Sequence, residues 1–190
     1  RLYTSKVDGT ARRSAQTALY HIANSLILML SPILCFTADE AWEVLHNNSQ
    51  DSTLYHTFYN IPEVKQHDEI NTRWSKACAF RDIVLKELEN KRTLGIIGSS
   101  LQAEIIIKAD KELYPALAHL GTDLKFAYMV SMIKLELADE NSVIVLPSSE
   151  AKCERCWHYS STVGGNANHA TICTRCIENL LGNGETRHFA

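Results

Sequence analysis

Four of the six cysteines stand in two closely spaced pairs in the last forty residues of the sequence. The pairs are Cys153-x2-Cys156 and Cys173-x2-Cys176, with sixteen residues between them. A gap of two residues lets both sulfurs of a tight turn face one centre, and two such turns supply the tetrahedral thiolate set that Zn²⁺ prefers. Four ligands leave no coordination position open for water. The spacing therefore predicts one structural zinc ion, which folds a segment too short to form its own core.

Other interpretations of these cysteines stay open at this point. The four could form two disulfides in a secreted mini-domain, remain reduced as buried side chains, or bind an iron–sulfur cluster. No signal peptide is visible at the start of the sequence, which favours a reducing, cytoplasmic setting and therefore the metal. Of the other two cysteines, Cys35 lies in an apolar run and Cys78 lies on a predicted helix next to its apolar face, and both are predicted to be small core residues.

The residues around the first pair carry groups that bind nucleic acids. Arg155 lies between the two cysteines, and Trp157, His158 and Tyr159 follow them. A guanidinium and aromatic rings displayed together could bind phosphate and stack on RNA bases. Trp157 could equally cover the zinc site while Arg155 is solvated, and spacing does not decide between these roles. His158 and His169 are expected to be surface histidines, because four thiolates already satisfy zinc.

A second candidate surface is basic and lies near the start of the chain. Arg12 and Arg13, beside Gln16 and Tyr20, fall in a helical pattern and could follow a phosphate backbone. A basic helical face is more often simply solvated, so the contact is a hypothesis. The chain contains no phosphate-binding Gly-rich loop, no Gly-x-Ser-x-Gly and no His-Glu-x-x-His. No catalytic residue is predicted.

Composition indicates a folded chain of one or two domains. The 190 residues are 45% hydrophobic and carry a net charge of −3, values that argue against intrinsic disorder and against a generic electrostatic binder of nucleic acid. The charge is uneven, since 1–30 are basic, 31–64 hold no Lys or Arg, and 96–150 are acidic. The longest apolar run, 22–35, is too short and too polar to cross a bilayer. No membrane partner is expected.

Apolar spacing predicts the elements that position these residues. Helices are expected over 11–30, from a capping box at Thr37 and Glu40 to about Leu45, from about Asp68 to a cap at Gly95, and over 111–120. Strands are expected over 102–107, 126–137 and 143–146, and 47–61 form a surface connection. The predicted fold class is α+β in several parts: a helical bundle portion over 1–95, a small α+β unit over 96–147 and a C-terminal four-cysteine zinc module over 148–190.

Three stretches together resemble a known family. They are 11–20 (ARRSAQTALY) with 32–40 (PILCFTADE), then 97–103 (IGSSLQA), and finally the two cysteine pairs with their intervening residues, including Arg155 and Trp157. In this order they resemble, nearly end to end, the C-terminal part of the bacterial isoleucyl-tRNA synthetases, which are class I aminoacyl-tRNA synthetases. The first two stretches look like the helical anticodon-binding domain and junction shared with valyl and leucyl relatives. The zinc module points to the isoleucyl branch.

The resemblance implies an ATP-dependent isoleucine–tRNA ligase, of which this part grips the anticodon stem and loop. In that family the residues that match Arg155 and Trp157 contact the anticodon. The ATP-binding domain with its His-Ile-Gly-His and Lys-Met-Ser-Lys-Ser motifs and the editing domain have no counterpart in this sequence, so ATP belongs only to the full-length enzyme. The chain is therefore expected to bind isoleucine tRNA without catalysis, as a cytoplasmic monomer joined to the rest of the synthetase.

Two alternatives come from other classes of protein. DNA glycosylases of the formamidopyrimidine type carry a terminal zinc finger with similar cysteine spacing, which also inserts an arginine into nucleic acid. Their catalytic N-terminus has no counterpart in this chain. The other alternative is a zinc-stabilised interaction module whose acidic middle segment is the partner surface. Absence of tRNA binding would favour that module.

Overall fold

The computed structural model describes residues 2–47, 51–65 and 67–186. Contacts within the chain group these residues into two compact units. The helical unit contains the described residues of 7–65, and the mixed unit contains 2–6 together with 67–186. Residues 67–93, which the sequence assigned to the helical part, thus share a core with the sheet. The division of the chain at residues 95 and 147 stays a prediction. Residues 187–190, the end of the predicted zinc module, lie outside the described residues.

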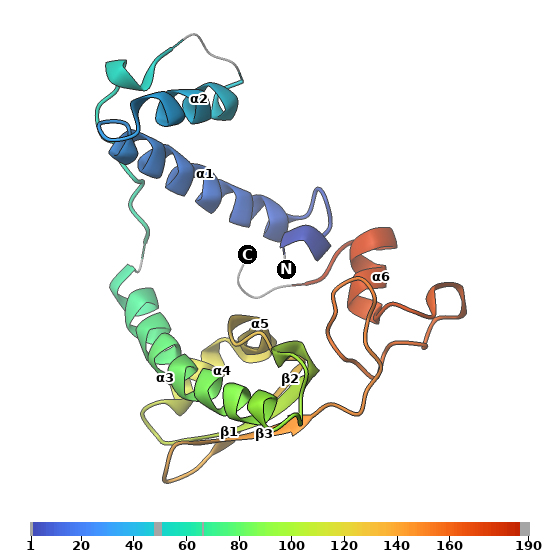
Figure 1. Cartoon of the computed structure of the whole chain (residues 1–190). Coiled ribbons are helices and arrows are strands. Elements are labelled where there is room, and N and C mark those ends of the chain that lie inside the picture. The colour runs from blue at the N-terminus through green and yellow to red at the C-terminus, as the bar shows by residue number, and fades with distance from the viewer. Residues whose placement is uncertain (1, 48–50, 66, 187–190) are drawn as a thin grey trace. The chain divides into compact units, whose positions relative to one another are not determined.

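The helical unit is built from two helices that lie side by side (Figure 1). They are α1 (Thr10–Leu30) and α2 (Cys35–Leu45), followed by a short 3₁₀ turn, η2 (Thr53–Tyr55). The helix predicted over 11–30 is confirmed. Buried Asn24 of α1 donates to the Tyr20 carbonyl at 2.7 Å, and its Oδ1 lies 3.0 Å from His46 Nε2. Both polar atoms of this buried amide therefore have hydrogen-bond partners. Without them, burying the amide would destabilise the fold.

The predicted capping box at Thr37 and Glu40 is wrong. Helix α2 begins earlier, at Cys35, so Thr37 lies inside the helix, and Leu34 caps it without a side-chain hydrogen bond. The helix starts early because the Leu34 N–H already bonds the Leu30 carbonyl at 2.8 Å, which leaves almost no connection between the two helices. Asp39, beside the supposed capping residues, instead accepts hydrogen bonds from a later loop.

Asp39 tethers the connection that follows α2. Its Oδ1 accepts from Ser52 Oγ at 2.8 Å, from the Thr53 N–H at 2.8 Å and from Thr53 Oγ1 at 3.2 Å. The backbone hydrogen bond from Thr53 and the side-chain bond from Ser52 lower the pKa of this carboxyl. Because hydrogen bonds favour the charged form, the tether is complete above the ordinary carboxyl pKa and weakens as pH falls through the lowered value.

Replacing Asp39 with Asn is expected to loosen this loop, because a neutral amide oxygen is a weaker acceptor than the charged carboxylate oxygen that holds all three donors. The Thr53 amide should then exchange its hydrogen faster, and acidification of the unchanged protein should produce the same effect. Exchange measured by NMR at neutral and acidic pH checks both. Glu40→Gln is the matched control, since Glu40 is an exposed carboxylate on the same helix. Equal Thr53 exchange in the Asp39 and Glu40 variants would contradict the tether.

The mixed unit contains one long helix, a three-stranded sheet and the cysteine-rich segment. Its elements are η1 (Leu2–Thr4), α3 (His67–Thr93), η3 (Ser100–Gln102), β1 (Ala103–Ala109), α4 (Tyr114–His119), η4 (Gly121–Asp123), α5 (Leu124–Ala127), β2 (Met132–Leu137), β3 (Ser142–Pro147), η5 (Ala167–His169) and α6 (Thr174–Leu181). The strand order is β2-β1-β3, with β1 parallel to β2 and antiparallel to β3. The predicted α+β class is confirmed.

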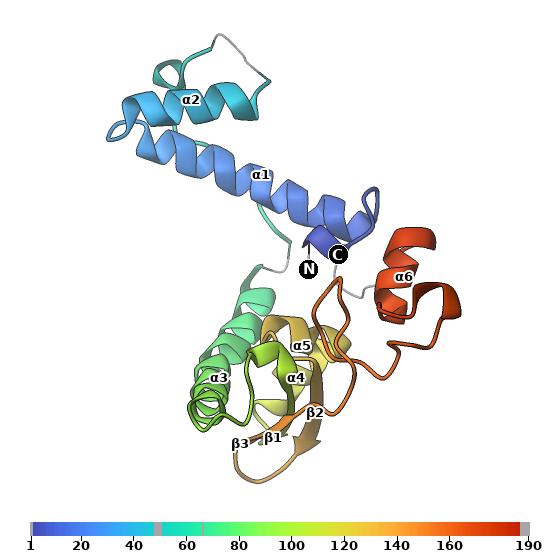
Figure 2. The same ribbon diagram turned by 45° about the vertical axis from the view of Figure 1, so that its right-hand side comes forward.

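One face of the sheet forms the main core. Alternate residues of β1 are buried, and α3, α4 and α5 cover that side (Figure 2). Helix α3 contributes a stripe of buried side chains at three- and four-residue steps: Ala77, Phe80, Val84 and Leu88. Tyr128, buried in the same core, donates its hydroxyl to the Ala77 carbonyl at 2.9 Å. Helix α3 is therefore joined to the sheet by packing, and to the end of α5 by a satisfied buried hydrogen bond.

The ends of two elements test the sequence predictions. Gly95, at φ +71°, closes α3 as predicted: its N–H bonds the Arg92 carbonyl and the next N–H bonds the Lys91 carbonyl, each at 3.0 Å. The strand expected from residue 126 is wrong over its first residues. Residues 124–127 form α5, and the chain turns at Met129, φ +55°, before β2 begins. Two parallel strands need a crossover connection between them. The first residues of the apolar run that begins at 126 belong to this connection, so the strand starts later than predicted.

Two further expectations concern residues outside the main core. Cys35 and Cys78 are exposed, so their prediction as core residues is wrong. Cys78 directly follows the buried Ala77 on α3, and a step of one residue turns a helical side chain by about 100°. Cys35 is the first residue of α2, one turn before the first buried residue of that helix. Within the ranges described, none of the helices combines the length and apolar character required to traverse a lipid bilayer.

Candidate metal centre and nucleic-acid interface

A small hairpin holds the first cysteine pair. Lys152 and Tyr159 form an antiparallel bridge, and the Cys153 N–H bonds the His158 carbonyl at 2.9 Å. Between them the chain reverses tightly, and the Trp157 N–H returns to the Cys153 carbonyl at 2.9 Å. This reversal requires φ +65° at Trp157. The local backbone therefore brings both sulfurs of the pair to the inside of the turn.

A helix start holds the second pair. Cys173 is the N-terminal cap residue of α6, and the Cys176 N–H bonds the Cys173 carbonyl at 2.9 Å in its first turn. The Cys173 N–H also points at Cys153 Sγ, 3.3 Å away. A hairpin turn and a helix start thus meet at their sulfurs, as the spacing predicted.

The sulfur geometry fits one tetrahedral zinc ion. All four Sγ atoms lie within 4.8 Å of one another. The Cys153–Cys176 sulfurs are 3.8 Å apart, and the Cys156–Cys173 sulfurs are 3.7 Å apart. A tetrahedron with Zn–S bonds of about 2.3 Å has edges of about 3.8 Å. The cysteines are free, and these separations exceed the roughly 2.05 Å of a disulfide. The disulfide interpretation is therefore excluded for this fold.

Burial makes the four cysteines the interior of their module. Cys153 and Cys176 are fully buried, and among the described residues the only apolar side chains other than cysteine that pack on the cluster are Val163 and Ile172. The hydrogen bond with Cys173 raises the pKa of the Cys156 thiol to about 11, and the same hydrogen bond lowers the pKa of Cys173, so the two thiols share one proton unequally. A divalent cation supplies the opposite charge, so metal binding would release thiol protons. The metal would provide the stability that an apolar core normally provides.

Trp157 presents its ring to solvent. The residue is 60% exposed, although its backbone is held by the first cysteine turn. Lys152 Nζ lies 5.4 Å from the centroid of the indole ring, within the range of a cation–π contact. This exposure favours a ring that faces a partner over the alternative in which Trp157 covers the zinc site. An exposed ring next to an ammonium group is a suitable platform for a base and its phosphate.

Arg155 has a different environment from Trp157. The side chain is half-buried, and its Nη1 donates to the Thr4 carbonyl at 2.7 Å. From the sequence, both residues were expected on one surface of the cysteine turn. In the structure Trp157 is exposed, whereas Arg155 is half-buried. The guanidinium still has further N–H donors beyond the one that Thr4 accepts.

His158 is half-buried, so its prediction as a surface histidine is wrong. Its ring lies edge-on to Phe126, with centroids 5.2 Å apart, and Nδ1 lies 3.1 Å from the Cys156 carbonyl. Burial lowers the pKa of His158, so the neutral ring donates from Nδ1 and keeps a lone pair on Nε2. That Nε2 is buried without a hydrogen-bond partner among the described residues. The ring packs the zinc module onto α5 rather than binding the metal.

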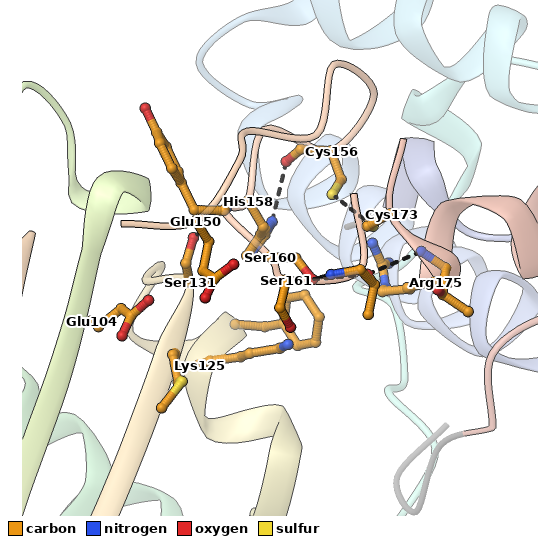
Figure 3. A pocket seen from close by; sticks show the side chains of 15 residues that line it. Glu104, Lys125, Ser131, Glu150, Cys156, His158, Ser160, Ser161, Cys173 and Arg175 are labelled. Atoms are coloured by element: carbon orange, nitrogen blue, oxygen red, sulfur yellow. Dashed lines mark hydrogen bonds between the residues drawn. The ribbon is translucent and has the colours of Figure 1, made fainter. Parts of the chain in front are cut away.

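A cavity of about 470 Å³ lies beside this contact (Figure 3). Cys156, Cys173 and Arg175 line it from the zinc module, and Glu104 and Lys125 line it from β1 and α5. Both signs of charge are present, so its electrostatics select no class of ligand.

The basic residues of α1 lie in the helical unit. Arg13, Gln16 and Tyr20 are exposed and follow one another along the helix, while Arg12 is half-buried. No acidic residue occurs in α1, so the helix offers a polar, basic surface. The phosphate-contact hypothesis for this surface stays a prediction.

Sequence reasoning missed two residues that organise the zinc module. Arg175, inside the second cysteine pair, forms a two-pronged ion pair with Glu185 at 2.6 and 3.0 Å. Asn179, buried on α6, accepts from the backbone of Lys6. The sequence carried no signal for Asn179, because its burial and its partner 173 residues away are visible only in the structure.

Comparison with known proteins identifies the class. Residues 1–107 match the family described as the anticodon-binding domain of tRNA ligase, more than half of the chain, and the chain belongs to this family. Residues 151–179 match a second family, described as a zinc finger found in FPG and IleRS. Together with the sulfur geometry, this match supports one structural zinc. Neither description is that of a catalytic domain.

The relatives are more specific. The chain is 49% identical to an isoleucine–tRNA ligase of Laribacter hongkongensis, 50% identical to one of Chromobacterium violaceum and 46% identical to one of Neisseria meningitidis, in each case over 100% of the chain. It spans about a fifth of the length of these relatives, 20% to 21%. The resemblance to bacterial isoleucyl-tRNA synthetases is confirmed. The glycosylase alternative is not favoured, because its zinc finger alone would leave the match over 1–107 unexplained.

Proposed function

We propose that the chain is the anticodon-recognition part of an isoleucine–tRNA ligase, and that it binds the anticodon stem and loop of isoleucine tRNA. The observation that carries the proposal is the presence of both matches, anticodon-binding domain and zinc finger, in one chain that is similar throughout to isoleucine–tRNA ligases. ATP-dependent aminoacylation would belong to the whole ligase. The parts over 1–95, 96–147 and 148–190 would be its helical, junction and zinc parts.

In this proposal the zinc module presents rigid contacts to an unstacked RNA loop. Zinc bound by Cys153, Cys156, Cys173 and Cys176 would hold the turn that displays Trp157, and the exposed indole would stack on an anticodon base. The ammonium group of Lys152, beside the ring, would neutralise a neighbouring phosphate. Arg155 would contribute the guanidinium donors that neither Thr4 nor Cys176 accepts.

Attraction to RNA would depend on local charge placement. A zinc ion with four thiolates carries a charge of about −2, so the metal centre itself repels phosphate. The cations that compensate are Lys152 and Arg155 beside the site and, in the helical unit, Arg12 and Arg13. Raising the salt concentration should therefore weaken RNA binding. The slope of this dependence should correspond to the few phosphate contacts that these cations make.

An exposed apolar surface on α1 indicates that another part of the ligase chain packs against this helix. An outward stripe at three- and four-residue steps is about half exposed: Leu19 51%, Ile22 52%, Leu26 51% and Met29 57%. A continuous apolar stripe of this size indicates a surface that another segment covers. We assign it to the rest of the ligase, since this chain spans only 20% of such a relative. A cytoplasmic ligase agrees with the finding that none of the six cysteines forms a disulfide. We propose that this ligase acts as a monomer.

Fluorescence anisotropy with the zinc-loaded chain tests the proposal. The titration compares isoleucine tRNA, a non-cognate tRNA and a DNA duplex, at two salt concentrations and before and after chelation. Preference for isoleucine tRNA that is lost on chelation is the expected result. Equal, salt-sensitive binding to all three would reduce the function to non-specific electrostatics. Preference for DNA would favour the glycosylase class, and no binding would favour an interaction module.

A further inference from the structure

The segment 4–6 lies against the zinc module, although it is distant in sequence. Arg155 Nη1 donates to the Thr4 carbonyl at 2.7 Å across 151 residues. The Lys6 N–H donates to Asn179 Oδ1 at 3.1 Å, and Lys6 Nζ donates to the Gly182 carbonyl at 3.0 Å. Main-chain groups of the segment are thus paired with Arg155 in the first cysteine pair and with Asn179 on α6.

Arg175 completes this contact from the second cysteine pair. Its Nη1 and Nη2 each lie 3.2 Å from Thr4 Oγ1. The guanidinium is fixed from two other directions, by Glu185 and by the ring of Phe126, whose centroid is 5.1 Å from Cζ. The side chains of Arg175 and Glu185 are only 17% and 13% exposed. A desolvated, bidentate arginine of this kind holds its remaining donors in one direction.

The approach of the two segments is close as well as polar. Ser5 is 4% exposed. Gly184 has φ +92°, and a Cβ placed there would lie 3.3 Å from Lys6 Cβ. The backbone at Gly184 therefore passes the segment at a distance that leaves little space for a side chain.

We propose that Arg155 and Arg175 are positioning residues that anchor Thr4–Lys6 to the zinc module, so that zinc binding fixes the segment directly ahead of the helical unit in the sequence. Each arginine lies inside a Cys-x2-Cys pair, so the metal sets its position. Over its described residues the module has few apolar side chains to hold these positions without the metal. The inference goes beyond RNA binding, since it concerns the chain alone.

Hydrogen exchange of the Lys6 amide, measured by NMR on the full chain without RNA, tests the anchor. Arg155→Ala is expected to retain zinc and to speed this exchange at least about tenfold, because the neighbouring charged hydrogen bond is lost. Chelation of zinc should have an equal or larger effect. Arg155→Lys should restore part of the protection, since an ammonium group can still donate to the Thr4 carbonyl. Amides in the middle of α1 provide the internal reference.

Trp157→Ala is the matched control. It changes the same cysteine turn but removes no contact to 4–6, so the Lys6 amide should exchange as in the unchanged protein. If Arg155→Ala loses zinc, Thr4→Val replaces it, because this nearly isosteric change removes the hydroxyl that accepts from Arg175 and leaves both cysteine pairs unaltered. Unchanged Lys6 exchange in the zinc-loaded Arg155 or Thr4 variant, or after chelation, would overturn the proposal. Since RNA is absent, failure here is distinguishable from failure of tRNA recognition.

Discussion

Replacing Cys176 with Ser is expected to abolish zinc binding and unfold the zinc module, while the helical unit stays folded. Cys176 is fully buried, and its sulfur is one corner of the tetrahedron. A serine hydroxyl does not ionise near neutral pH and cannot replace the thiolate. Metal binding contributes about 10–16 kcal/mol in comparable small zinc domains, far more than the few apolar contacts of this module could supply. Metal analysis and the amide NMR signals of 151–181 measure the two effects.

Cys78→Ser is the matched control, since it makes the same chemical change at an exposed cysteine on α3. That variant should bind one zinc ion and keep the signals of 151–181. Acidification should reproduce the Cys176 result, because protons compete with zinc for the thiolates and the affinity falls as pH falls. One equivalent of zinc in the Cys176 variant, with a folded module, would show that the assigned ligand set is incorrect.

Replacing Trp157 with Ala is expected to weaken binding of isoleucine tRNA by a factor of about 5 to 150, with zinc content unchanged. The factor corresponds to stacking of about 1–3 kcal/mol per base. Zinc is retained because the ring is 60% exposed and makes no contribution to the cysteine cluster. Alanine also keeps a Cβ at φ +65°, so the backbone strain at this position stays the same. Anisotropy titrations at one salt concentration measure the change.

Trp157→Phe separates stacking from shape. Phenylalanine retains an aromatic face and should recover most of the lost affinity, whereas glycine would also relax the positive φ and confuse the comparison. The salt dependence should be the same for all three proteins, because the ring carries no charge. Affinity equal to that of the unchanged chain in the alanine variant would remove Trp157 from the interface.

Local chemistry explains why the metal site was predictable. The ligand spacing, the turn and the helix start all lie within 153–176, and a Cys-x2-Cys turn imposes its own geometry. The helix periods of α1 and α3 were predicted for the same reason, since a 3.6-residue pattern is a property of the segment alone. The capping box failed because Thr37 and Glu40 fit the motif equally well inside a helix. The tight turn between α1 and α2 decided between these two placements.

The surroundings of Arg155 were not predictable from the same pattern. The motif places a guanidinium at the first cysteine turn but contains no information about Thr4. His158 shows the same limit: its neighbour Phe126 belongs to α5, a helix that the sequence pattern assigned to a strand. Contacts between distant segments depend on how the elements pack, and hydrophobic period alone does not specify packing.

The anchor between Thr4 and Arg155 has a consequence for how the protein is made. The two residues are 151 positions apart, and chains grow at about 5–20 residues per second. Thr4 is therefore synthesised roughly 8–30 s before Arg155, by the same elongation rate. During that interval the carbonyl and hydroxyl of Thr4 cannot have their arginine partners. The segment around Thr4 thus obtains its hydrogen-bond partners only after the cysteine-rich stretch has been translated. The zinc available when that stretch folds then sets when the contact forms.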